Sequence, residues 1–464
     1  MPKNRSPLIG LALVALAGTL AVWRPWATPP ELPDSSETER SPAQQAAAAA
    51  GQILSPRLPR APAAGLRNAV LVLPFGNASN DIDQDFFSDG LTEDLIGTLA
   101  RVGGLNTIGR HVAMAYKHAQ LPAQSFAQSL GVRYMLEATV QRQSNQFLLT
   151  ARLIDTAHGQ PIWSEHFERP LGDIFMVHKA LADRVIASVM PAAELKNTSR
   201  PQPASAETLE AFELSLRARA RLNEITRESV QSARELLERA VARDPNFLPA
   251  YPNLHGVINQ FLTHPWTPEF NSMDTVRALL ELAGKAVSID PTHPLARAIY
   301  AESLTLVGQH GTAVAQIDAV VSHHTTDIDL LRLAATVVGR SGDFERSVTL
   351  LKRGLKLDPV IALPYWAEPL ASQLYYQGNY AESAEVAAPC ARRSSAQPYC
   401  RLWFAAALAQ QGKLEEARRE SADIVQHFPE VTVRQTVVRA GIGYRETEHA
   451  RHFGEGLRKA GLPD

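Results

Sequence analysis

The chain has 464 residues, of which 45% are hydrophobic and 20% are charged, so it is long enough for two or three globular domains. Its 46 basic and 48 acidic residues leave a net charge of −2, and this balance excludes a strongly basic surface for nucleic acid. With only two cysteines, Cys390 and Cys400, no disulfide framework or cysteine-based zinc site can define the fold.

An uncharged apolar run from Pro7 to Trp23 follows the basic residues Lys3 and Arg5. As a helix this run would extend about 25 Å, which is at the short end for a membrane crossing. Because the basic side of such a helix stays in the cytoplasm, we expect a single-pass inner-membrane anchor with the bulk of the chain in the periplasm. A cleaved signal peptide stays open as the alternative, since Ala15–Ala17 and Thr19–Ala21 are small-residue cleavage sites.

Residues 25–66, which follow this anchor or signal segment at 1–24, are rich in proline, alanine and serine and almost without aromatic side chains. Such a composition cannot bury enough apolar surface to offset the entropy of ordering the chain. We therefore predict a disordered linker that holds the folded part of the chain away from the membrane.

Between residues 67 and 190, short β-rich runs alternate with amphipathic stretches. The pattern predicts, in chain order, a strand at 68–75, a helix at 86–102, a strand at 105–110, a short helix at 122–131, strands at 132–142, 146–156 and 160–169, and a helix at 171–190. A polar turn between the first two of the three consecutive strands indicates a hairpin. The order βαβαβββα is typical of a two-layer α+β domain.

Asp89, Glu93 and Asp94 form an acidic cluster in the first of these helices, of the kind that metal or acid–base chemistry would need. Neighbouring residues of a helix point to different sides, and acidic residues early in a helix complement its dipole, so we favour a structural role. Trp163 and Phe167 are expected to pack on the core of the sheet rather than stack on a ligand. The histidines of this region show no paired ligand spacing, and no phosphate-binding loop or nucleophile elbow is present.

The pieces VLPFGNAS, FFSDGLTEDL, LGVRYMLEATV, ARLIDTAHGQPIW and LGDIFMVHKALA resemble the domain related to the amino-terminal part of the periplasmic protein TolB. The resemblance covers residues 67–190. It implies a binding module of the kind found upstream of tetratricopeptide repeats in bacterial regulators, some of which carry an adenylate or guanylate cyclase domain and others a winged-helix domain in front of it. Here the apolar run begins at Pro7, so we expect neither of these output domains.

Residues 205–464 are expected to be helical throughout and carry an internal period. Gly342, Gly378 and Gly412 recur every 34 to 36 residues, each followed two residues later by Phe, Tyr or Leu. A period near 34 residues, with glycine between two helices and proline after the second, resembles the tetratricopeptide (TPR) repeat. Because a single unit cannot bury its apolar face, we predict a solenoid of about six stacked repeats and a closing helix pair, with an insertion at 261–273.

First helices line the concave surface of such a solenoid, which suits an extended peptide or a partner helix. On this numbering Glu302, Arg332 and Thr336 lie on first helices and face the groove, although ordinary solvated side chains are the alternative. The pairs His449 with His452 and His323 with His324 lack a third ligand nearby in sequence, so solvated positions are expected and no metal site is predicted.

Cys390 falls near the end of the second helix of one repeat, and Cys400 near the start of the first helix of the next. Successive repeat helices pack antiparallel, so the two side chains can meet. In an oxidising compartment we expect a disulfide, with the two Cα atoms no more than about 7 Å apart. The alternative is a pair of small buried hydrophobic side chains.

Together these features predict a non-enzymatic, membrane-tethered periplasmic adaptor or sensor that binds protein partners through the TPR groove and the α+β module, without a cofactor and without nucleic acid. The alternative is a regulatory subunit that acts on a separate adenylate or guanylate cyclase or on a transcriptional effector. An enzyme is disfavoured because the sequence contains no recognisable catalytic constellation.

Overall fold

The computed structural model describes residues 69–79, 81–118, 121–190, 203–224, 226–263, 271–321, 325–358, 364–393 and 398–464. All of these described residues belong to one compact unit. The predicted anchor or signal segment, the linker, most of the predicted insertion and the pair His323–His324 lie outside the described residues. Among the helices that are described, none is long and apolar enough to cross a membrane.

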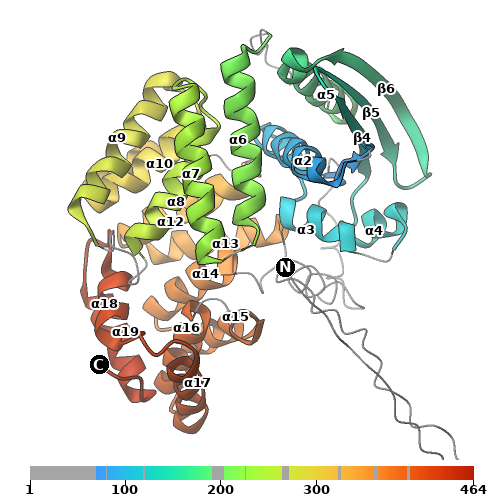
Figure 1. The fold of residues 1–464 in the computed structure, drawn as a ribbon. Helices are drawn as coiled ribbons and strands as arrows, with labels where there is room; N and C mark the ends of the chain where they lie inside the picture. Colours follow the sequence, from blue (N-terminus) through green and yellow to red (C-terminus); the bar gives the residue numbers. More distant parts are fainter. Residues whose placement is uncertain are drawn as a thin grey trace, which may run out of the picture. The chain divides into compact units, whose positions relative to one another are not determined.

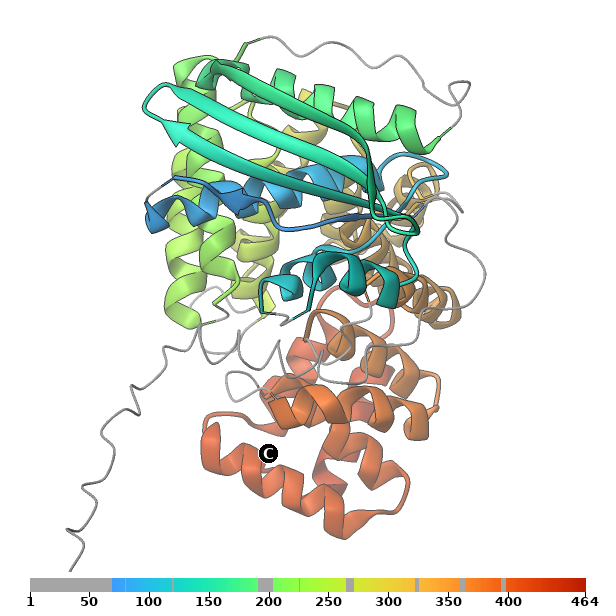
Figure 2. The same ribbon diagram turned by 90° about the vertical axis from the view of Figure 1, so that its right-hand side faces the viewer.

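The amino-terminal domain contains a mixed sheet of six strands within the described residues. These strands are β1 (Ala69–Val72), β2 (Gly76–Asn77), β3 (Asn106–Thr107), β4 (Tyr134–Gln143), β5 (Gln146–Asp155) and β6 (Gln160–Pro170). Their order is β3-β1-β4-β5-β6, with β1 parallel to both neighbours and with β4, β5 and β6 antiparallel; β2 pairs with β4. The long antiparallel strands are prominent in Figure 2. The predicted combination of a small sheet with helices is confirmed.

Four helices of the described residues belong to this domain. They are α2 (Asp85–Ala100), α3 (Arg110–Ala115), α4 (Ala123–Ser129) and α5 (Ile174–Val189). Figures 1 and 2 show α2 and α5 on the same side of the long strands. On the other side, Thr150 and Arg152 of β5 are exposed, which accounts for the alternation of apolar and polar residues along that strand.

The bounds of two predicted strands in this domain were wrong. The strand expected at 68–75 is shorter, β1 at Ala69–Val72, and Gly76 and Asn77 form the separate short strand β2. The run LNTIGR at 105–110, expected to be a strand, has only two strand residues, and helix α3 begins at its last residue. This second strand is short because the backbone leaves the sheet after Ile108. The N–H of Ile108 still donates to Val70 O in the sheet, but the N–H of Gly109 donates to Leu357 O in the helical domain.

The rest of the chain is a series of antiparallel helix pairs. Their bounds are α6 Ala206–Leu222, α7 Arg227–Arg243, α8 Ala250–Thr263, α9 Met273–Ile289, α10 Pro294–Leu306, α11 His310–Asp318, α12 Ile328–Arg340, α13 Phe344–Leu357, α14 Pro364–Tyr376, α15 Tyr380–Arg393, α16 Tyr399–Gln410, α17 Leu414–His427, α18 Val433–Gly441 and α19 Glu448–Lys459. Gly342, Gly378 and Gly412 lie between the two helices of a pair at φ 102°, 80° and 77°. This left-handed conformation suits glycine and explains the period seen in the sequence.

First helices of neighbouring pairs also contact each other, as in α8 with α10, α10 with α12, and α14 with α16. The helical part is therefore a solenoid of the TPR type, as predicted. Its closing pair folds back onto first helices: α19 contacts both α14 and α16, and the ring of Phe453 stacks on Trp403 with the centroids 3.6 Å apart.

The apolar interior of the described residues forms two large clusters. One joins the sheet domain to α6, α7 and α8, and the other runs from α8 to the closing pair. The first includes edge-to-face contacts of Phe212 in α6 with Phe87 and Phe175 of the sheet domain, at centroid distances of 6.4 and 5.0 Å. The second contains no residue of the sheet domain. The sheet domain is thus fused by apolar packing to the start of the solenoid only.

Candidate functional site

The amino-terminal end of α12 carries acidic side chains for a local reason. Asp327 is the N-cap of this helix, and its Oδ1 accepts hydrogen bonds from the N–H groups of Asp329 and Leu330 at 3.0 and 3.1 Å. Aspartate is favoured at this position because it satisfies N–H groups that have no partner within the helix. The cap places Asp329 in the first turn of α12, beside Asp327.

These two residues belong to a polar cluster that we name the acidic clamp: Thr326, Asp327, Asp329, Asp358 and Tyr365. Its members come from the start of α12, the residue after α13, and the start of α14. Asp327 and Asp358 are buried, with 4% and 0% of their surface exposed.

The acidic clamp holds residues 100–112 of the sheet domain, which we name the docked segment. The hydroxyl of Thr326 lies 2.9 Å from Ala100 O and 3.1 Å from Leu105 O. The guanidinium of Arg101 lies 3.8 Å from the carboxylate of Asp327. One threonine and one aspartate therefore hold the end of α2 and the turn that follows it.

Arg110, at the first position of α3, makes the central contact. Its Nη1 donates to Asp329 Oδ2, and its guanidinium lies over the ring of Tyr365, 5.3 Å from the centroid. The Tyr365 hydroxyl donates to the other oxygen of Asp329. Burial would raise the pKa of Asp329, but Arg110 and these hydrogen bonds hold it well below its usual range, so the carboxylate stays charged. Burial and the neighbouring carboxylate of Asp329 raise the pKa of Tyr365.

Asp358 binds the start of α3. Its Oδ1 accepts from the N–H of Val112 at 3.2 Å, and its Oδ2 pairs with Nδ1 of His111. Beside it, the N–H of Gly109 donates to Leu357 O at 2.9 Å. A Cβ atom at position 109 would lie 2.5 Å from the Cβ of Asp358, so this close approach requires glycine. The docked segment is thus recognised through its backbone as well as through its charges.

The predicted groove residues occupy less open positions than expected. Glu302 does lie on a first helix, α10, but only 3% of its surface is exposed. Arg332, on α12, is half-buried, with its guanidinium 5.1 Å from the centroid of the Tyr365 ring. The hydroxyl of Thr336 donates to Arg332 O within the same helix. Arg332 therefore lies against the acidic clamp, while Glu302 belongs to the interior.

Glu302 is part of a buried polar network between α8, α10 and α12. Its carboxylate lies 3.5 Å from Nη1 of Arg340 and 3.7 Å from Nδ1 of His255. His255 Nε2 lies 2.8 Å from the hydroxyl of Ser303. A serine, a histidine and a carboxylate in this order are the parts of a hydrolytic triad.

The burial of this network argues against catalysis. His255 and Ser303 are both 0% exposed, so a substrate has no access to the hydroxyl, and that hydroxyl also lies 3.0 Å from Ile299 O. Burial lowers the pKa of His255 to about 4, which makes it a weak base near neutral pH. We interpret the network as a structural bridge between first helices.

The acidic cluster of α2 pairs with cations. Nη1 of Arg219, in α6, lies 2.7 Å from Asp94 and 3.9 Å from Glu93, and Lys117 pairs with Asp89. Burial raises the pKa of Asp89, although Lys117 opposes the shift. These ion pairs fit the structural role favoured from the sequence.

The remaining predicted side chains have structural partners. Trp163 is buried in the core, and its Nε1 donates to Ser188 Oγ at 2.9 Å. Phe167 packs against the same core. His452 Nε2 lies 2.8 Å from the hydroxyl of Tyr380, and His449 contacts an aromatic ring edge-to-face. Within the described residues, no group of three or more His, Cys, Asp or Glu side chains could hold a metal ion.

The two cysteines lie where the repeat geometry predicts. Cys390 is in the last turn of α15 and Cys400 is in the first turn of α16. They form a disulfide in this structure, and their Cα atoms are 5.8 Å apart, within the limit of about 7 Å. Both residues are buried.

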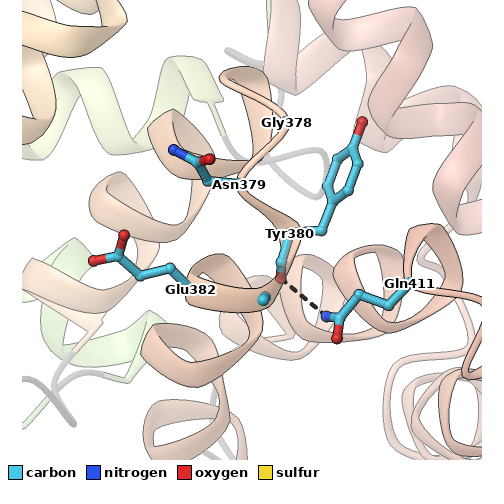
Figure 3. Close-up of a pocket in the computed structure, with 6 residues that line it drawn as sticks. Gly378, Asn379, Tyr380, Glu382 and Gln411 are labelled. Carbon is cyan, nitrogen blue, oxygen red and sulfur yellow. Dashed lines mark hydrogen bonds between the residues drawn. The ribbon is translucent and has the colours of Figure 1, made fainter.

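A surface hollow of about 410 Å³ lies at the turn between α14 and α15 (Figure 3). It is lined by Gly378, Asn379, Tyr380, Ala381, Glu382 and Gln411. The hydrogen bond drawn there joins Gln411 Nε2 to Tyr380 O at 3.0 Å and ties one repeat to the next. The hollow is open to solvent and contains no buried charged group, so the acidic clamp is the stronger candidate site.

Comparison with known proteins gives a partial relationship. No family model matches the chain. Over 243 residues it is 32% identical to "Putative adenylate cyclase 3" of Rhizobium meliloti (strain 1021), a match that covers 52% of this chain and 39% of that protein. The chain thus spans well under half the length of this relative.

Two solved structures resemble parts of this chain, both with low TM-scores. The crystal structure of PilW, a widely conserved type IV pilus biogenesis factor, has a TM-score of 0.35 at 16% identity and covers 48% of this chain and 94% of its own. That of YrrB, a TPR protein with an unusual peptide-binding site, has a TM-score of 0.29 at 13% identity and covers 42% of this chain and 93% of its own.

Proposed function

We propose that the protein is a non-enzymatic adaptor that binds protein partners through its helical repeats. The acidic clamp carries this proposal, because it holds a polypeptide segment through side chains and backbone together. Asp358 accepts from the backbone N–H of Val112, and Leu357 O accepts from that of Gly109. A surface that binds the backbone of one segment has the chemistry of peptide recognition.

The proposal includes a membrane tether and a periplasmic location. The apolar run at 7–23 with its basic start supports the tether, and the paired cysteines suit an oxidising compartment. The resemblance of residues 67–190 to the TolB amino-terminal domain supports a second binding module on the same chain.

Topology is tested with reporters fused after Asp464. Alkaline phosphatase fused there is expected to be active, and a fluorescent protein that matures only in the cytoplasm is expected to stay dark. The opposite pattern would contradict the periplasmic location.

Partner binding is tested by cross-linking the full-length chain in intact cells and capturing it from detergent extracts. We expect a reproducible partner whose recovery falls in Arg332→Gln, on a first helix. Arg346→Gln is the matched control, because Arg346 lies on the outer helix α13 and pairs with Asp318 near the surface. An equal loss in both variants, or no partner at all, would contradict binding by the first helices.

One observation favours a second function, a regulatory subunit acting on a separate cyclase: the match of 243 residues to a protein named as an adenylate cyclase. This function requires contact with a cytoplasmic effector. A bright cytoplasmic reporter after Asp464, together with altered cyclic-nucleotide production on deletion of the chain, would favour it over the periplasmic adaptor.

A further inference from the structure

The sheet domain is attached to the solenoid in two different ways. At α6 the attachment has an apolar core, with the rings of Phe87 and Phe175 packed on Phe212 inside one hydrophobic cluster. Ion pairs of Arg219 with Asp94 and of Glu213 with Arg142 flank this core. At α12 to α14 the attachment is polar, and the hydrophobic cluster of those helices includes no residue of the sheet domain. Apolar interfaces of this kind are permanent, whereas polar interfaces between domains resemble those of transient complexes.

The polar attachment has matched charges. The guanidinium groups of Arg101 and Arg110 in the docked segment lie against the carboxylates of Asp327 and Asp329 in the acidic clamp. The imidazole of His111 pairs with the carboxylate of Asp358 and is a cation only when it is protonated. Charge complementarity of this kind gives specificity and fast association, and it is sensitive to competition by another cation.

We infer that the acidic clamp is the docking site for an arginine-bearing segment of a partner protein, and that the docked segment occupies it in cis until the partner arrives. This inference rests on the proposed adaptor function and names the site and the chemistry of its ligand. The sheet domain stays joined to α6 when the clamp exchanges its occupant, because only the polar attachment has to open.

The contacts define what a competing segment must contain. It needs an arginine to reach Asp329 and to lie over the ring of Tyr365, as Arg110 does. It needs glycine just before that arginine, since a Cβ atom there would overlap the side chain of Asp358. It also needs free backbone N–H groups after the arginine, as at the start of a helix. A Gly-Arg pair that opens a helix satisfies all three conditions.

A cis occupant weakens binding in trans by a calculable amount. A covalently tethered segment acts at an effective concentration on the order of millimolar. If the docked segment itself binds the clamp with an intrinsic Kd of about 10 μM, any partner segment would bind the closed chain on the order of 100-fold more weakly than the open one.

The test uses the full-length chain and a fluorescent peptide with the sequence of residues 105–116, LNTIGRHVAMAY. Wild type is compared with Arg110→Glu, which repels the docked segment from Asp329 and leaves the clamp residues unchanged. The matched control is Arg133→Glu, because Arg133 is an exposed arginine of the sheet domain that pairs with Asp155 of the same domain. A peptide with valine in place of its glycine serves as the second control.

We expect Arg110→Glu to bind the peptide at least tenfold more tightly than wild type and Arg133→Glu, and the valine peptide to bind none of them. Addition of Asp329→Lys to Arg110→Glu should abolish binding. Equal binding by wild type and Arg110→Glu, or none by either, would overturn the inference.

If circular dichroism shows that Arg110→Glu is unfolded, Gly109→Ala replaces it under the same criteria, because that change leaves every charge in place. If the peptide does not bind as expected but the chain still captures a cellular partner, the acidic clamp is not the docking site and the proposed adaptor function is retained. Failure of both rejects the proposed function.

Discussion

Replacement of Gly109 by alanine should open the acidic clamp selectively. Gly109 has φ −63° and ψ 153°, which alanine adopts without strain, so the backbone conformation contributes no cost. The added Cβ would lie 2.5 Å from Cβ and 2.7 Å from Cγ of Asp358, whose side chain is 0% exposed and has no room to swing away. Overpacking of this kind costs about 1–3 kcal/mol, which corresponds to a 5- to 150-fold larger open population.

Trypsin cleavage after Arg110 measures that population, because a protease cuts this bond only when the segment leaves the clamp. We expect Gly109→Ala to be cut about 5- to 150-fold faster than wild type, after normalisation to the unfolded chains. Gly103→Ala is the matched control, since a Cβ there meets nothing within 4 Å. Cleavage of Gly109→Ala at the wild-type rate would refute the close contact with Asp358.

Three further outcomes are expected. Burial lowers the pKa of His255 to about 4 in the folded chain against 6.5 when unfolded, so its stabilisation is complete above pH 6.5 and is lost as the pH falls toward 4. In urea unfolding, His255 alone should account for about 2 kcal/mol of stability lost between pH 7.5 and pH 5, and His255→Gln should show a pH dependence smaller by this amount. Alkylation of denatured, unreduced periplasmic protein should leave Cys390 and Cys400 unlabelled, and Cys400→Ser should cost about 2–3 kcal/mol; extensive labelling would mean that the bond is absent. Phe453→Ala should cost about 3–5 kcal/mol in thermal unfolding through loss of the stack on α16, whereas Val438→Ala, 39% exposed, should stay within about 0.5 kcal/mol.

The parts of the fold that depend on local pattern could be predicted from the sequence. Short β-rich runs and a polar turn indicated the antiparallel strands, and the recurrence of Gly342, Gly378 and Gly412 indicated the turns between the helices of a pair. The position of the cysteine pair followed from the same repeat geometry. Each of these inferences uses residues a few positions apart or one repeat apart.

The acidic clamp could not be predicted, because its contacts join residues more than 200 positions apart, as in Thr326 with Ala100. The strand predicted at 105–110 was too long, because only Asn106 and Thr107 form β3 and helix α3 begins at Arg110. A glycine directly before an arginine was a local indication of a turn that the strand prediction passed over.

Glu302 was misplaced for a related reason. Its helix, α10, packs on neighbours over most of its circumference, so a single glutamate among small apolar residues is buried and paired rather than solvated. A lone charge on an otherwise apolar helix face is the sequence feature that could have indicated an internal ion pair.

Amide hydrogen exchange at the docked segment tests the central claim most directly. The N–H groups of Gly109 and Val112 donate to Leu357 O and Asp358 Oδ1. In the wild-type chain both should therefore exchange more slowly than unprotected loop amides, but faster than amides of the adjoining solenoid helices, because only the polar attachment has to open. Asp329→Asn should speed both without changing protection in β4 and β5. Exchange of these two amides at the rate of an unprotected loop in the wild-type chain would contradict the account.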